Sequence, residues 1–107
     1  MVANLNPKLT AFEAQAAANG FLLDNLPDRY GAYEPRLTSN NQMWRVAVHL
    51  TYPIIGSVGE VGEICISAFS GAVVSSTPLT EMREQARKLY EQHGAAIQAA
   101  FLQSRNS

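Results

Sequence analysis

The sequence has one cysteine and two histidines, and these shortages exclude several kinds of site. Cys65 has no second cysteine with which to form an internal disulfide, so we expect a protein of the reducing cytoplasm, although Cys65 could pair between chains. Ile64 and Ile66 flank it, which predicts a buried and unreactive thiol. His49 and His93 lack the short paired spacing of zinc ligands. We therefore predict no metal site, no cofactor and no catalytic residue.

Basic clusters and long apolar runs are also missing. The formal net charge is −1, and the eight lysines and arginines are scattered, which argues against direct binding to nucleic acid. No stretch approaches the ~20 apolar residues that span a bilayer, and the first residues lack the charged and apolar regions of a signal peptide. We expect a cytoplasmic protein with no membrane partner.

What the sequence does contain is enough apolar material for one core. Of 107 residues, 47% are hydrophobic and 16% are charged, which fits one globular domain over residues 1–107. Residues 43–52 alternate as a strand does. One face of that strand would hold Trp44, Val46, Val48, Leu50 and Tyr52.

Two further strands are predicted after residue 56. Residues 60–69 are apolar on both faces, which is typical of a strand that is central in its sheet or covered twice. Ser70-Gly71 is a turn signal, so residues 72–75 can return as a third strand. The sequence thus predicts a three-stranded antiparallel sheet.

Helices are predicted on both sides of these strands in the sequence. Thr10-x-x-Glu13 forms a capping box for a helix over residues 8–25 that continues through Gly20. Its apolar stripe is predicted to be Leu9, Phe12, Ala16, Gly20 and Leu23. The fold class is therefore α+β, of order α-β-β-β-α.

The C-terminal helix is predicted to be the longer one. Thr77 supplies its N-cap and Pro78 its first turn, and His93 lies on its core-facing stripe. About 26 residues at 1.5 Å each would give ~39 Å. Such a helix is longer than three short strands can cover, so its second half must fold back, pack on the first helix or meet another protein.

Residues 27–42 contain two prolines, Gly31 and two adjacent asparagines. They are predicted to form a long loop, and loops of this length in compact domains are often functional. Two interpretations stay open: a binding loop, or a connector held by Tyr30 and Tyr33 that carries no activity.

The run Gly56-x-x-Gly59-x-x-Gly62 does not predict a phosphate loop, because a strand follows it and neither a lysine nor a helix does. We interpret these glycines as hairpin or bulge positions. Glu60 and Glu63 are three apart, which places them on opposite faces of a strand unless a bulge lies between them. A pair of catalytic acids is therefore not predicted.

Several short runs together suggest a family. They are Trp44-Arg45-Val46-Ala47-Val48, Leu50-x-Tyr52-Pro53, Gly59-Glu60-Val61-Gly62-Glu63-Ile64, Ala68-Phe69-Ser70-Gly71 and Thr77-Pro78-x-x-Glu81-Met82. With them, residues 43–82 resemble a group of small uncharacterised bacterial proteins often encoded beside PIN-type toxin nucleases. The resemblance implies an antitoxin-like or partner-binding role and brings no catalytic residues. The chain more loosely resembles PepSY-like and cystatin-like modules, which bind or inhibit other proteins.

The leading hypothesis is a protein-binding module, antitoxin-like or an inhibitor of a partner enzyme, that acts by contact and forms homodimers. Its partner surface is expected at Tyr30, Tyr33, Leu89, Ile97 and Phe101. The alternative is a small enzyme or small-ligand-binding domain that uses the strand face of Arg45, His49 and Glu63. A deep pocket at His49 would favour the alternative, and a flat apolar patch would favour the binding module.

Overall fold

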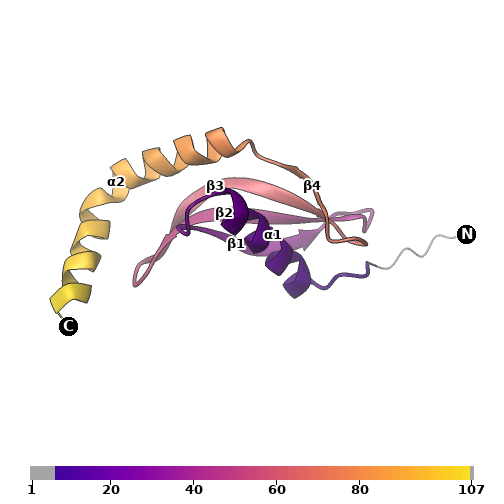
Figure 1. The fold of residues 1–107 in the computed structure, drawn as a ribbon, viewed down its shortest axis with the longest axis horizontal. Coiled ribbons are helices and arrows are strands. Elements are labelled where there is room, and N and C mark those ends of the chain that lie inside the picture. The colour runs from indigo at the N-terminus through magenta and orange to yellow at the C-terminus, as the bar shows by residue number, and fades with distance from the viewer. Residues whose placement is uncertain (1–6, 107) are drawn as a thin grey trace, which may run out of the picture.

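The computed structural model describes residues 7–106, and their side chains as far as Leu102. It is an α+β fold with one antiparallel sheet and two helices, as predicted, but the sheet has four strands in the order β1-β2-β3-β4 (Figure 1). The expected count of three strands is wrong. The elements are α1 (Ala11–Asn25), β1 (Tyr30–Leu37), β2 (Met43–Tyr52), β3 (Gly56–Ser67), β4 (Val73–Ser76) and α2 (Leu79–Asn106).

The additional strand is β1, which occupies half of the segment predicted to be a loop. It pairs antiparallel with β2, and its register shifts between Tyr33 and Arg36. Glu34 has a φ of 52° at this bulge, and Pro35 follows it. A proline is tolerated there because β1 is an edge strand. The bulge also breaks the alternation by which a strand is recognised, so the loop prediction was wrong.

Both helices pack on the same face of the sheet. The predicted apolar face of β2 is confirmed, since Val46, Val48 and Leu50 are buried there. The two faces of β3 differ, however, because the described residues place no helix on its second face. This strand is central in the sheet, between β2 and β4, which is one of the two predicted alternatives. The core consists of Ala18, Leu22, Leu26, Ala32, Val46, Val48, Leu50, Val61, Ile64, Ile66, Met82 and Ala86.

The first helix has the predicted capping box, in which the Glu13 amide donates to Thr10 and the Thr10 amide donates to Glu13. It continues through Gly20, as expected. Its buried stripe, however, is Ala14, Ala18 and Leu22. The predicted stripe of Phe12 and Leu23 faces outward, so that assignment was wrong.

The second helix has 28 residues and extends past the end of the sheet (Figure 1), which confirms the predicted overhang. Met82 and Ala86 are buried, but His93 is exposed, so its predicted place on the core stripe is wrong. Thr77 lies two residues before the helix, and its hydroxyl accepts a hydrogen bond from the Glu63 amide at 3.0 Å. Thr77 therefore joins the start of α2 to β3.

Two of the three glycines in the β2–β3 region show why glycine is needed there. Gly56 has a φ of 82° in the hairpin, a conformation that glycine adopts at little cost. A Cβ on Gly62 would lie 2.9 Å from the Cβ of Thr77 and 3.0 Å from the Cγ of Met82. The interpretation of this run as hairpin and bulge glycines is confirmed.

Candidate functional site

The residues of the predicted ligand face lie together on the side of the sheet that carries no described helix. Arg45 and His49 project from β2, and Glu63 projects from β3 beside Ala47. The Arg45 guanidinium donates to both Glu63 carboxylate oxygens, from Nε and from Nη2, each at 3.1 Å. This hydrogen-bonded carboxylate raises the pKa of Arg45, which is already cationic at neutral pH.

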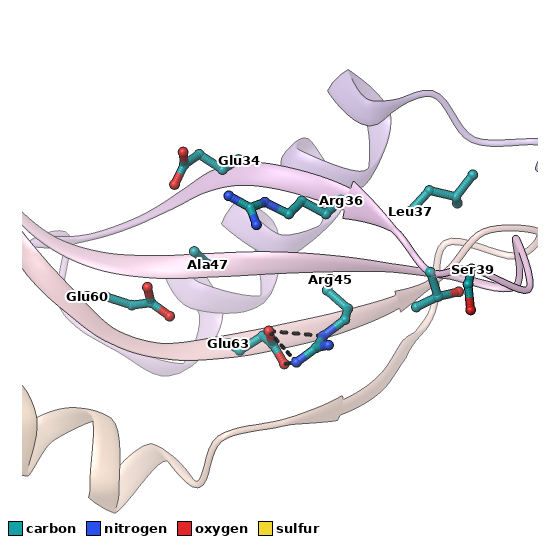
Figure 2. Close-up of a pocket in the computed structure, with 9 residues that line it drawn as sticks. Glu34, Arg36, Leu37, Ser39, Arg45, Ala47, Glu60 and Glu63 are labelled. Atoms are coloured by element: carbon teal, nitrogen blue, oxygen red, sulfur yellow. Dashed lines mark hydrogen bonds and ion pairs between the residues drawn. The ribbon is translucent and has the colours of Figure 1, made fainter.

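A hollow of about 590 Å³ opens on this face, and Figure 2 shows its charged side chains on three neighbouring strands. Its lining residues are Glu34, Arg36, Leu37, Thr38, Ser39, Arg45, Ala47, Glu60 and Glu63. Arg36 and Arg45 are cross-strand partners. Like charges placed directly opposite each other repel. The Arg45–Glu63 ion pair reduces that repulsion. The Arg36 guanidinium points toward the hollow.

Glu60 and Glu63 share this face, because the bulge that the prediction made a condition for this does lie between them. The register of β3 against β2 shifts so that Val48 pairs with Gly62 and His49 pairs with Glu60. The extra residue, Val61, turns into the core and is buried. A bulge inserts one extra residue into a strand, so two residues that are three apart in the sequence come to lie on the same face of the sheet.

His49 is fixed at the far end of the face from Arg45. Its Nδ1 lies 2.7 Å from the Ser57 hydroxyl, and the Tyr33 ring packs at a centroid distance of 4.7 Å. Its Nε2 is buried without a hydrogen-bond partner among the described residues. In serine hydrolases a histidine acts as the general base for a neighbouring serine hydroxyl, and a third group orients that histidine. The described contacts of His49 supply no such group.

Cys65 also lies on this face, as the cross-strand partner of Arg45, and it is half-buried. The prediction of a buried thiol is wrong because Ile64 and Ile66, its neighbours in sequence, point to the opposite face. Among the residues that the structure describes, no group of three or more His, Cys, Asp or Glu could hold a metal ion. The described helices include none that is long and apolar enough to cross a membrane.

The residues of the predicted partner surface do not form one patch. Tyr33 lies on the charged face, whereas Tyr30 and Leu89 are half-buried against the core. Ile97 is only 1% exposed, because its side chain is covered by the β2–β3 hairpin of its own chain. Of the five, Phe101 alone is a large apolar side chain left exposed, at 43%.

Phe101 belongs to a second candidate surface, which we call the α2-end surface. It surrounds a recess of about 100 Å³ lined by Tyr52, Pro53, Ile54, Ile97, Ala100 and Phe101. The ring of Tyr52 lies 6.4 Å from those of both Tyr90 and Phe101. The side chain of Ile54 is also exposed, at 66%, whereas Leu102, 56% exposed, is placed by the helical repeat on the other side of α2.

Sequence reasoning missed Ile54. The signal for it was available, because Pro53-Ile54-Ile55 is an apolar run placed at the tip of a hairpin, where polar residues are usual.

Comparisons of this chain with protein-family models, with curated proteins and with solved structures give no match. The resemblance suggested by residues 43–82 therefore stays a prediction.

Proposed function

We propose that this protein is a protein-binding module whose partner docks on the α2-end surface. The observation that carries the proposal is the exposure of Ile54 and Phe101 on the two sides of a recess lined mainly by apolar side chains. Contiguous exposed apolar patches of this kind are typical of interaction sites. A recess of this size can accept one apolar side chain of a partner, as anchor pockets in interfaces do.

The shape of the molecule supports the same proposal. Its radius of gyration is 16.0 Å, whereas a compact domain of about 100 residues has about 13 Å. The excess comes with the overhang of α2, whose second half meets the rest of the chain at the hairpin tip (Figure 1). A helix held on one side leaves its other side available to a partner.

The finer proposal is an antitoxin-like protein or enzyme inhibitor of the bacterial cytoplasm. It rests on the resemblance of residues 43–82 to proteins encoded beside PIN-type nucleases. A module of this kind acts by covering its partner's surface, so it needs no catalytic residue of its own. A purified PIN-type nuclease from the same genome is the first partner to test.

The experiment is affinity capture from the native lysate with the wild-type protein and three variants, followed by titration of the purified partner. Phe101→Asp and Ile54→Asp each place a charge in the α2-end surface, and Val74→Asp places one on β4, where Val74 is also exposed. Loss of an aromatic anchor typically costs ~2 kcal/mol or more of binding free energy, which is about 30-fold in Kd.

We expect the two variants of the α2-end surface to lose the captured protein and the β4 variant to retain it. Ile54→Asp guards against misfolding, because Ile54 is at the hairpin tip and is more exposed than Phe101, at 66% against 43%. A partner that binds all three variants as tightly as wild type would rule out this surface. Inhibition of the purified nuclease by wild type, and its loss in Phe101→Asp, would test the antitoxin-like role.

A second candidate function, binding of a small charged ligand, is favoured by the hollow on the open face. The hollow has acidic side chains on β1 and β3 and basic side chains on β1 and β2, with Ala47 between them. This arrangement suits a ligand with both an anionic and a cationic group. Isothermal titration with free amino acids tests it: we expect binding that Arg36→Gln abolishes and Arg83→Gln, on α2, leaves unchanged, and no heat with wild type would refute it.

A further inference from the structure

The outward side of α1 is a second apolar surface, separate from the α2-end surface. Phe12 is 78% exposed and Leu23 is 68% exposed, near opposite ends of the helix. Their spacing and that of Ala16 and Gly20 place all four on one side of the helix. The sheet covers the other side of α1, through Ala14, Ala18 and Leu22.

Gly20 is not explained by the packing of its own chain. It lies in the middle of α1, where glycine weakens a helix relative to alanine. It has no positive φ, and an added Cβ would meet nothing within 4 Å. A glycine at such a position is useful where another backbone must approach closely.

The order of these residues along α1 is symmetric. Positions 12 and 23 are centred at 17.5 and positions 16 and 20 at 18, so the two large side chains flank the two small positions. A second copy packed antiparallel would set Phe12 against the partner's Leu23 and Ala16 against the partner's Gly20. Such a self-complementary contact is what a two-fold dimer requires.

The charges that flank α1 favour the same occupant, whereas two charges within the helix weaken the contact. Asp24 lies in the last turn, where α1 has no basic residue. In an antiparallel pair it would lie near the partner's Glu13, which is in the first turn, and like charges repel. Lys8 precedes the helix by three residues and Asp28 follows it by three, so opposite charges would meet at both ends of the pair. Glu13 lies beside the stripe, and its carboxylate accepts from the Thr10 amide.

We propose that two copies of this chain associate through antiparallel packing of their α1 helices, with Phe12 seated on the partner's Leu23. The contact is one helix pair, smaller than a standard interface, so the dimer is weak and depends on concentration. It goes beyond the proposed function, because it leaves the α2-end surface free for a different protein.

The substitution Gly20→Ala distinguishes this proposal from a role of Gly20 within a single chain. Alanine should strengthen α1, so we expect the midpoint of thermal unfolding of the dilute protein to rise by about 4–8 °C. The added methyl group should hold the two helices apart, and we expect sedimentation equilibrium to show a dimer Kd raised about tenfold. Stability and association thus change in opposite directions.

Gly94→Ala is the matched control, because Gly94 is also inside a helix with nothing within 4 Å of an added Cβ. It should raise the thermal midpoint and leave the dimer Kd unchanged. Phe12→Ser should abolish the dimer, whereas Phe101→Asp should not affect it. The proposal is overturned by a wild-type protein that stays monomeric up to millimolar concentration, or by Gly20→Ala dimerising as wild type does.

The antiparallel orientation has its own test in a Cys65→Ser background. A mixture of Phe12→Cys and Leu23→Cys proteins should form a disulfide-linked heterodimer on mild oxidation, because the two positions face each other across the pair. Each variant alone should give little covalent product. Efficient crosslinking of Phe12→Cys with itself would refute the antiparallel arrangement.

Discussion

The substitution Ile97→Ala asks whether the second half of α2 is part of the folded domain. Ile97 is 1% exposed, between α2 and the β2–β3 hairpin. Replacing a buried isoleucine with alanine typically costs 2–5 kcal/mol of unfolding free energy. Here the overhanging helix can shift toward the hairpin and partly close the cavity, so we expect the low end, about 2 kcal/mol.

Urea denaturation followed by circular dichroism measures this loss, and hydrogen exchange locates it. We expect lower protection of the amides of residues 90–102 and unchanged protection in β2. Ala96→Gln is the control, since Ala96 is the neighbouring exposed position and glutamine is a good helix former. If Ile97→Ala unfolds within ~0.5 kcal/mol of wild type, as a surface change would, the packing of α2 on the hairpin is not what stabilises this end.

Three other changes follow from the fold. Gly62→Ala should destabilise the protein by about 1–3 kcal/mol in urea denaturation, because its Cβ would overlap the residues that lead into α2; an unchanged midpoint would contradict that close approach. Thr10→Ala removes the capping box and should cost about 1 kcal/mol, whereas Thr80→Ala, an exposed control, should cost less. Burial raises the pKa of Tyr30 and Tyr52, so the folded state favours their neutral form. That stabilisation is complete below the unfolded pKa of about 10 and is lost as the pH rises through the raised values; absorbance titration should show two tyrosines ionising late, and normal ionisation of all four would refute it.

The strand β1 shows where sequence reasoning fails on this chain. Its eight residues include Gly31 and Pro35, and the bulge at Glu34 shifts the alternation by one position. Edge strands tolerate such residues because one row of their hydrogen-bonding groups is not used by the sheet. In β1 part of that row is used by α1, since Gln15 donates to the Ala32 carbonyl and Asn19 accepts from the Ala32 amide. No local pattern in residues 27–42 predicts these hydrogen bonds with α1.

Which face of α1 is buried was also decided by residues outside α1. The helix is alanine-rich, and two stripes of it have the three-and-four spacing of a buried face. Periodicity identifies the larger stripe, with Phe12 and Leu23, but the space above β1 and β2 admits the smaller one. Small side chains let the helix lie close to the sheet, so the larger residues were left on the outside.

The sequence by itself determined the α+β class, the β2 strand with its buried face, the capping box of α1 and the excess length of α2. These features depend on interactions between residues that are close in the chain, which leave a period or a cap signature. Only the tertiary structure decided that β1 is a strand and which side of α1 is buried. It also decided that a bulge gathers Glu60 and Glu63 beside Arg45, and that Ile97 lies under the hairpin while Phe101 stays exposed. Each of these depends on contacts between segments far apart in the chain, and such contacts leave no period in the sequence.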